Sequence, residues 1–430
     1  MVLPWQYWNR VLAINLRRSV GAIALVTTLG VTPGAQAQNF TVIHYFSGGQ
    51  DGATPMAGLT MDRAGNLYGT AAHGGSLGGD CASSGCGTVF RLANRNSNWV
   101  VTPLYSFSGG NDGANPEANV VIAPDGSLYS TTFLGGGTCN GNGCGTVFNL
   151  KPPLTACKAA LCPWTESVLY RFTGLDGVGP VGAVVFDEAG NLYGATSAGG
   201  FLNGGTVYEL QPMGGHWAGR LLYSPYGYPN SGLIRDGSGN LYGTAFIGGN
   251  GQGSVYEVTP SGSGWIGTNL YAFTNGADGG YPWAGLIFDA SGNLYGSTTA
   301  GGTGNGGTVF QLTPSNNEWT LNTLYSFTGP GNGRFVVGPV GSLIMDDAGS
   351  LYGTTFADGA NGFGSIFKLT PESGGWKYTA LYDFTGGSDG GYPYSDLVFD
   401  AHGNLYGTAS IGGKGQCPDG CGVIFEITPQ

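Results

Sequence analysis

The chain is predicted to be all-β, a seven-bladed β-propeller of four-stranded blades in which the N-terminal strand completes the last blade. The motif G-[NS]-L-Y recurs seven times, at steps of 49 to 64 residues. Each copy lies among four short runs rich in β-branched and aromatic residues. In addition, 84 of the 430 residues are glycine, which argues against helices because a glycine inside a helix costs about 1 kcal/mol relative to alanine.

Each repeat unit contains four predicted strands, and the fifth unit shows them clearly. They are Ala284–Asp289, Asn293–Thr298, Gly307–Leu312 and Trp319–Phe327, each bounded by Gly, Pro, Asn or Asp. Four strands in about 50–60 residues, repeated seven times, are typical of a propeller. A β-solenoid is the alternative, but its coils are much shorter. The repeated L-Y and L-Y-x-F aromatics are predicted to fill the space between blades, and the six Trp residues that precede them are predicted to be structural anchors of the outer strands.

The repeated motifs resemble those of a known family. D-x-x-G-N-L-Y-G-T, G-T-V-F-x-L-T-P and L-Y-S-F-T-G-G-x-D-G are similar to the GloVer tandem repeat, a bacterial family named for Gloeobacter and Verrucomicrobia. The resemblance covers roughly residues 40–430 and implies an exported propeller with no settled activity. D-x-x-G-N-L-Y also resembles the start of NHL-type blades. That similarity implies the strand order P-x-A-G-L-I-F-D innermost, then N-L-Y-G-T, then G-T-V-F, with L-Y-S-F outermost.

This strand order predicts how the ring closes. The repeats begin with an outermost-type strand, Phe40–Phe46, and end with a third-type strand, Val423–Thr428. The last blade therefore lacks its outer strand, which the N-terminus is expected to supply. Pairing the two ends removes two exposed sheet edges.

Residues 1–37 are predicted to be a signal peptide, followed by a single propeller domain over residues 38–430. Arg10, Arg17 and Arg18 precede the apolar stretch Val20–Val31, and Ala35-Gln36-Ala37 matches an A-x-A cleavage site. The apolar stretch is too short for a good membrane anchor, and the arginine pair is only a weak twin-arginine signal. We therefore expect a monomer exported to the periplasm or the cell exterior, without membrane insertion.

The charge balance narrows the choice of partners. Without residues 1–37 the chain has 12 basic and 26 acidic residues, a net charge of −14. Such a surface repels nucleic acid and anionic lipid. An extracytoplasmic glycan, protein or peptide is the expected partner.

The eight cysteines form four close pairs, Cys81/Cys86, Cys139/Cys144, Cys157/Cys162 and Cys417/Cys421. An even number at such short spacing in an exported protein predicts local disulfides. Zinc is the alternative, but the spacings lack the C-x2-C pairs of structural zinc sites, and the four histidines do not accompany them.

Two acidic motifs recur. D-x-x-G-[NS] follows the first strand of each unit, with Ala123 replacing the Asp in the second unit, and the other six carry Asp62, Asp187, Asp236, Asp289, Asp346 and Asp400. G-G-x-D-G and looser copies follow the outer strand at Asp51, Asp112, Asp176, Asp278 and Asp389. Both patterns are typical of turns, in which Asp accepts backbone hydrogen bonds and Gly takes a positive φ. Calcium is the weaker alternative, and no other cofactor is expected.

The loops between the second and third strands are unequal. They are longest in units 1, 2 and 7, which are neighbours in a closed ring, and these loops hold three of the cysteine pairs. We expect a raised, disulfide-stiffened wall on that side of the face, because long rigid loops on a regular scaffold commonly carry function.

The residue after each repeated Pro varies from unit to unit: Met56, Glu117, Val181, Asn230, Trp283, Val340 and Tyr394. Two positions later, Asn119 and Asp396 replace a mostly small residue. These side chains are expected near the axis, where they either face channel water or bind a ligand together with the nearby aromatics Tyr226, Tyr228, Tyr281 and Tyr392.

The predicted function is an exported binding module whose ligand, a glycan or an extended peptide, binds the glycine-rich loop face near units 7, 1 and 2. No H-E-x-x-H, G-x-S-x-G or phosphate-loop motif is present. A glycoside hydrolase or lyase using Glu117 and Asp396 is one alternative. A purely structural envelope protein is the other.

Overall fold

The computed structural model describes residues 39–76, 81, 84–95, 98–137, 139, 141–153, 163–315, 318–329 and 337–428. The chain separates into two units, 1–36 and 37–430, and every described residue lies in the second. The predicted signal peptide falls outside the described residues and stays a prediction. Within the described part, no helix is long and apolar enough to cross a membrane.

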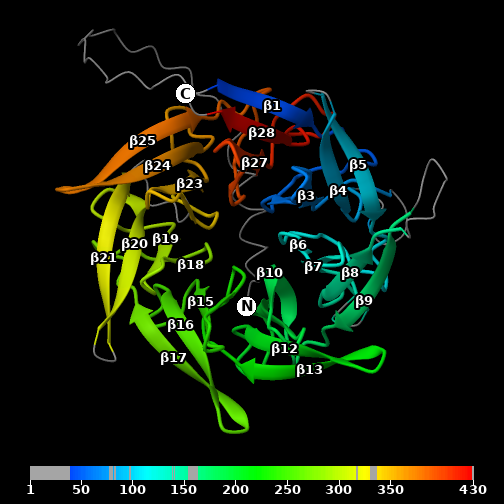
Figure 1. Cartoon of the computed structure of the whole chain (residues 1–430), viewed down its shortest axis with the longest axis horizontal. Coiled ribbons are helices and arrows are strands. Elements are labelled where there is room, and N and C mark those ends of the chain that lie inside the picture. Colours follow the sequence, from blue (N-terminus) through cyan, green and yellow to red (C-terminus); the bar gives the residue numbers. More distant parts are fainter. Residues whose placement is uncertain are drawn as a thin grey trace. The chain divides into compact units, whose positions relative to one another are not determined.

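Seven four-stranded antiparallel sheets form the blades of a propeller (Figure 1). Blade 1 comprises β2 (Thr60–Met61), β3 (Leu67–Ala71), β4 (Thr88–Arg95) and β5 (Asn98–Ser106). Blade 2 comprises β6 (Val121–Ile122), β7 (Leu128–Thr132), β8 (Thr146–Lys151) and β9 (Thr165–Arg171), and blade 3 comprises β10 (Val178–Phe186), β11 (Leu192–Ala198), β12 (Thr206–Met213) and β13 (His216–Tyr223).

The remaining blades follow in chain order. Blade 4 comprises β14 (Ile234–Arg235), β15 (Leu241–Ala245), β16 (Ser254–Ser261) and β17 (Gly264–Ala272), and blade 5 comprises β18 (Ile287–Phe288), β19 (Leu294–Thr298), β20 (Asn305–Ser315) and β21 (Glu318–Thr328). Blade 6 comprises β22 (Ile344–Met345), β23 (Leu351–Thr355), β24 (Ser365–Glu372) and β25 (Gly375–Asp383). Blade 7 comprises β26 (Val398–Phe399), β27 (Leu405–Ala409), β28 (Val423–Thr428) and, from the other end of the chain, β1 (Asn39–Tyr45).

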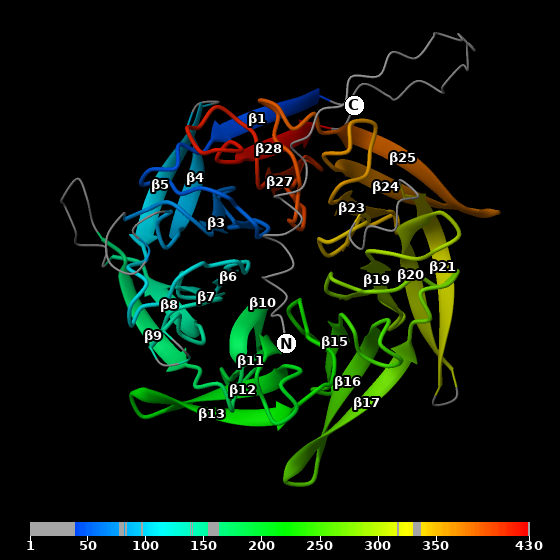
Figure 2. The ribbon, with the colours of Figure 1, turned by 180° about the vertical axis from the view of Figure 1, so that it is seen from behind.

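The predicted closure of the ring is confirmed. Strand order in blade 7 is β1-β28-β27-β26, and β1 pairs antiparallel with β28, placing Phe40 opposite Ile427. The two strands lie side by side in both ribbon views (Figures 1 and 2). The predicted order of strands within a blade is confirmed as well, because every sheet runs from its first to its fourth strand without a crossover.

The predicted length of the innermost strand is wrong. In blade 5 the sequence predicts Ala284–Asp289, whereas β18 contains only Ile287–Phe288. The residues before β18 leave the ladder of their own blade, and the Gly285 N–H donates to Ser342 Oγ of blade 6 at 3.1 Å. The backbone near the axis therefore bonds between blades, which a single repeat cannot reveal.

Aromatic side chains fill the space between blades, as predicted. In most blades the Phe that ends the L-Y-x-F motif meets the aromatic ring of the next blade's third strand edge to face, as Phe273 meets Phe310 at 5.2 Å and Phe172 meets Tyr208 at 5.0 Å between ring centroids. All four rings are buried. A Cβ on Gly296 would lie 2.6 Å from the Phe310 ring, so the glycine of L-Y-G provides the room. Edge-to-face pairs add stability beyond their burial.

The repeated Trp residues have the predicted structural role. Trp319 of blade 5 packs against Tyr242 of blade 4, with 6.3 Å between ring centroids. Trp99 packs in the same way on Tyr406, and this contact joins blade 1 to blade 7 across the closure. These rings therefore belong to the interfaces between blades.

Candidate functional site

Seven turns, here called the turn ring, join the first and second strands of the blades. In blade 5, Asp289 Oδ1 accepts hydrogen bonds from the backbone N–H groups of Ser291 and Asn293, and its Oδ2 accepts from Asn293 Nδ2 and the Tyr295 hydroxyl. Burial alone would raise the pKa of Asp289, but these donors hold it below its usual value. The turn interpretation of D-x-x-G-N is confirmed, and blade 2 replaces it with Asp125, which accepts from Ser127.

The second acidic motif is also a turn. Asp278 accepts hydrogen bonds from the Thr274 backbone N–H, the Thr274 hydroxyl and the Tyr271 hydroxyl. At the closure His44 stands where the other blades have tyrosine, and its Nε2 lies 3.2 Å from Asp51 Oδ2. Among the described residues no group of three or more His, Cys, Asp or Glu side chains is arranged to hold a metal ion.

Three of the predicted disulfides form, Cys81–Cys86, Cys139–Cys144 and Cys417–Cys421. Cys157 and Cys162 lie outside the described residues. The second cysteine of each bridge also anchors the next blade, because its carbonyl accepts the N–H of the residue before the repeated Pro. These bonds run from Asn115 to Cys86, from Gly179 to Cys144 and from Thr54 to Cys421, at 2.8 to 2.9 Å. The disulfide-bearing loops thus position the axial residues of blades 1, 2 and 3.

A groove of about 490 Å³ opens between the loops of blades 6 and 7, beside the Cys417–Cys421 disulfide. Its side-chain lining comprises Phe363, Ser388, Ile411, Pro418 and Asp419, and glycine backbone forms the rest. Sequence reasoning placed a wall near unit 7 but missed these lining residues. Phe363 is the signal that was available, since it is an aromatic residue within a glycine-rich loop.

An aromatic track, defined as Phe363, Tyr392, Phe356 and Tyr394, leads from this groove to the axis. Successive ring centroids lie 5.6, 4.6 and 4.8 Å apart. Tyr392 holds its place with a left-handed backbone at φ 52°, as do Tyr228 and Tyr281 at 58° and 57°. Thr54 and Asn115, which also precede the repeated Pro, have the same backbone at 55° and 54°, so this conformation, rare for non-glycine residues, is a feature of the repeat.

Trp283 and Asn230 lie on other blades. Phe246 contacts both Trp283 and Tyr281, with 5.3 Å between ring centroids in each case. The buried Asn230 Nδ2 has no acceptor among the described residues. Tyr226 is 65% exposed, and it takes no part in the ring contacts that the structure records for the aromatic track.

Side chains three residues after the repeated Pro meet at the axis and form what we call the axial chain. Asp396 Oδ2 accepts from Asn119 Nδ2 at 2.8 Å, and Asp396 Oδ1 accepts from the Ser342 N–H. Asn119 Oδ1 in turn accepts from the Gly58 N–H at 2.7 Å. Burial raises the pKa of Asp396, and the hydrogen bonds it accepts only partly offset this rise. Asp396 therefore joins blades 2, 6 and 7.

Glu117 lies one residue after the repeated Pro, and its environment differs from that of Asp396. The side chain is partly exposed, while the flanking Pro116 and Ala118 are buried. It makes no hydrogen bond to any other residue that the structure describes. Burial raises the pKa of Glu117 to about 7. Its charge helps to raise the pKa of Tyr394, after the larger effect of that tyrosine's own burial.

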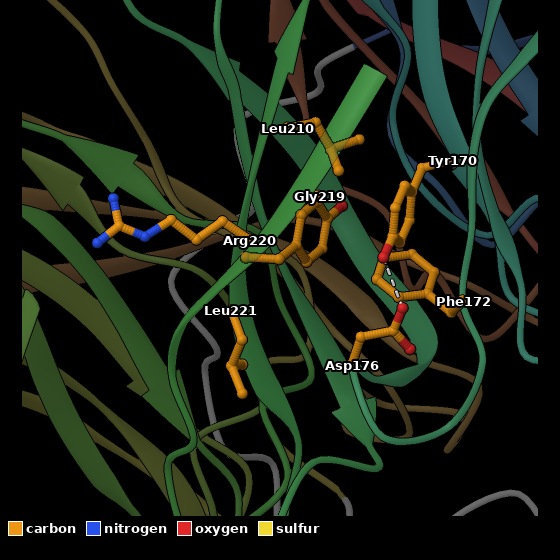
Figure 3. A pocket seen from close by; sticks show the side chains of 8 residues that line it. Tyr170, Phe172, Asp176, Leu210, Gly219, Arg220 and Leu221 are labelled. Carbon is orange, nitrogen blue, oxygen red and sulfur yellow. Dashed lines mark hydrogen bonds between the residues drawn. The ribbon is translucent and has the colours of Figure 1, made fainter. Parts of the chain in front are cut away.

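Another hollow, of about 30 Å³, lies between the outer strands of blades 2 and 3 (Figure 3). Tyr170 covers Gly219 there and donates to Asp176 at 2.6 Å. A Cβ on Gly219 would lie 2.5 Å from the Tyr170 ring. This volume is close to that of one water molecule, so the hollow belongs to the packing between blades.

The sequence model of the Gloeobacter/Verrucomicrobia repeat matches residues 27–227, 82–265 and 228–430. These overlapping ranges span the whole propeller, and the resemblance seen in the motifs is confirmed. No curated protein matches the sequence significantly.

Two solved structures are distantly similar. A putative oxidoreductase (glucose dehydrogenase) from Thermus thermophilus is 14% identical with a TM-score of 0.40, and the match covers 91% of this chain and 100% of that chain. A putative 6-phosphogluconolactonase from Bacteroides uniformis is 12% identical with a TM-score of 0.46, and the match covers 75% of this chain and 86% of that chain. Similarity this low carries no information about activity.

Proposed function

The chain belongs to the Gloeobacter/Verrucomicrobia repeat family, and we propose that its propeller is an exported binding module for an extended glycan. The observation that carries the proposal is the groove between blades 6 and 7 together with the aromatic track that continues from it to Tyr394. A concave surface that leads into a row of rings suits a ligand longer than one sugar.

The chemistry of the groove suits a carbohydrate better than the other ligand classes. Phe363 offers an apolar face, Ser388 offers a hydroxyl, Asp419 offers a carboxylate, and the glycines offer backbone donors and acceptors. No lysine or arginine lines the groove, so anionic ligands are disfavoured. The neighbouring disulfide limits the motion of the loop, and a rigid site loses less entropy when it binds.

A location outside the cytoplasm is consistent with this role. The structure contains three disulfides. Disulfides form and persist mainly in oxidising compartments. Export through the predicted signal peptide at residues 1–37 is part of the proposal.

A binding role is preferred over glycoside hydrolysis because the structure does not pair Glu117 and Asp396 as an acid and a base. A hydrolase needs one carboxylate as acid and the other as base or nucleophile. Both oxygens of Asp396 already accept hydrogen bonds from neighbouring blades. The ionisable neighbour whose pKa responds to Glu117 is Tyr394.

Screening the purified protein on a glycan array tests the proposal. We expect binding to a restricted set of linear glycans, with affinity lowered about tenfold or more by Phe363→Ala and Tyr394→Ala, a loss of roughly 1.4 kcal/mol. Trp283→Ala tests whether the contact surface extends to blade 5. Tyr226→Ala is the control, because this exposed ring lies outside the track. Absence of any glycan binding, or binding that Phe363→Ala and Tyr394→Ala leave intact, would count against the site.

A further inference from the structure

The residues one position after the repeated Pro in blades 7, 1 and 2 combine one carboxylate with an aromatic ring and a thioether. Tyr394, Met56 and Glu117 occupy the same repeat position on three consecutive blades. All three side chains are partly exposed, whereas the residues on either side of Met56 and Glu117 are buried. Met56 and Glu117 therefore keep exposed surface between buried neighbours.

We propose that Glu117 binds a protonated primary amine of the ligand, with the Tyr394 ring and the Met56 thioether flanking the ammonium group. The inference rests on the proposed glycan-binding function and deepens it. The ligand class becomes a glycan of hexosamine units whose amino groups are free. The aromatic track connects Phe363, beside the groove, through the buried Phe356 to Tyr394 near Glu117, so we place the amine-bearing unit at the axial end of the ligand.

The first argument is that Glu117 lacks a partner. Every acidic residue of the turn ring accepts several hydrogen bonds within its own blade, and Asp396 accepts two from neighbouring blades. Glu117 accepts none from the described residues, although burial already raises its pKa to about 7. A carboxylate that loses part of its hydration without gaining a donor is destabilised, and a charged donor from a ligand would offset that cost.

The second argument is the sign of the local charge. Among the residues one and three positions after the seven repeated prolines, Glu117 and Asp396 are the only charged ones. His73 of blade 1 contacts Asn115, two residues before Glu117, and burial lowers the pKa of His73 below its ordinary 6.5, so it supplies little positive charge at pH 7. Carboxylates without compensating cations in a confined region attract a positive group.

The third argument is the match between an ammonium group and the three side chains. An ammonium ion pairs with a carboxylate through charge-assisted hydrogen bonds. It is also attracted to the face of an aromatic ring, an effect that grows as water is excluded. An N-acetylated sugar offers an amide without charge at the same position, so the subsite should distinguish the two forms.

Two oligosaccharides of equal length test the inference, a glucosamine oligomer and its fully N-acetylated counterpart, compared by isothermal titration calorimetry. We expect the free-amine oligomer to bind at least tenfold more tightly. Glu117→Gln, which keeps shape and removes charge, should abolish this preference and leave affinity for the N-acetylated oligomer unchanged. Glu372→Gln, at the exposed end of β24, changes the net charge equally and should leave the preference intact.

A second readout is proton release. At pH 7 Glu117 is partly protonated before binding, and an ammonium group favours the carboxylate form. The ligand amine, partly neutral at pH 7, takes up protons when it binds as ammonium, so the number of protons released, measured from the buffer dependence of the binding heat, should be larger for the wild type than for Glu117→Gln.

Equal affinities for the two oligomers, with no effect of Glu117→Gln, would overturn the amine subsite while the glycan site stands. Failure of both oligomers, together with failure of every glycan on the array, would remove the proposed function and this inference with it. Binding of a lysine-containing peptide that depends on Glu117, with no glycan bound, would also overturn the assignment to hexosamine.

Discussion

The turn ring and the axial chain are both rings of seven positions, but they are built in opposite ways. In the turn ring six blades use the same Asp to accept two backbone N–H groups and the tyrosine hydroxyl of its own blade, as Asp289 accepts from Ser291, Asn293 and Tyr295. In the axial chain the bonds join different blades, as Asn119 joins Asp396. One ring is a repeat of local chemistry, while the other is a set of individually matched contacts.

The difference follows from where each ring lies. A turn of the turn ring has open space around it, since a Cβ on Gly292 would meet nothing within 4 Å, so the same arrangement fits in every blade. At the axis the inner segments of neighbouring blades approach closely, and seven identical side chains would crowd one another. A mixture of glycines with Asn119, Ser342 and Asp396 relieves the crowding and supplies bonds between blades. Variation at the axis is therefore not by itself a sign of ligand binding, and the amine subsite is proposed for Glu117 because it accepts no hydrogen bond from the described residues.

Two glycines of blade 3 offer the largest expected effect. Both have left-handed backbone, Gly182 at φ +66° and Gly190 at φ +85°. A Cβ on Gly182 would lie 1.8 Å from Gly232 N of blade 4, whereas a Cβ on Gly190, in the turn ring, meets nothing within 4 Å. We expect Gly190→Ala to cost about 1–2 kcal/mol for the backbone alone. Gly182→Ala should cost several kcal/mol more or prevent folding.

Thermal and urea unfolding of the two variants, followed by circular dichroism, check this prediction. Similar losses in the free energy of unfolding for both variants would mean that the backbone at the axis accommodates a Cβ as readily as the turn ring does. This result would contradict the proposed difference between the two rings.

A double-mutant cycle measures the second effect. Asn119→Ala, Asp396→Ala and their combination should show a coupling of about 1–3 kcal/mol, because the two side chains share a hydrogen bond to a charged group. Asp289→Ala and Asp346→Ala, in the turns of neighbouring blades, share no partner and should add within about 0.5 kcal/mol. Additivity at the axis, or strong coupling between the two turns, would contradict the distinction.

The sequence predicts features that are decided within one repeat better than features that depend on contacts between repeats. The turn role of Asp289 and the pairing of β1 with β28 were predictable, because the residues that decide them recur within one repeat or at the two chain ends. The short β18 and the bond from Asn119 to Asp396 were not, because their partners lie in other repeats. The groove around Phe363 depends on how two unequal loops meet, which no repeat pattern encodes.

The smallest expected effect is on the pH dependence of folding stability. The contribution of Asp289 should rise with pH, while that of Asp396 should fall. Hydrogen bonds lower the pKa of Asp289 below its ordinary 3.8, although burial opposes them. Its ionised form therefore stabilises the fold above pH 3.8, and that contribution is lost as the pH falls. Burial raises the pKa of Asp396 despite its donors. Its contribution is therefore full below 3.8 and is lost as the pH rises through the folded-state value.

Asparagine at each position keeps the shape and removes the titration. Between pH 3 and pH 7 the deficit in Tm of Asp289→Asn should grow, while that of Asp396→Asn should shrink. The slopes carry the information, because each substitution also rearranges hydrogen bonds by an amount that does not depend on pH. Melting curves collected at several pH values at constant ionic strength give both slopes. Slopes of the same sign would mean that the environment of Asp396 favours its ionised form, as that of Asp289 does. The axial chain would then not be a buried junction between blades.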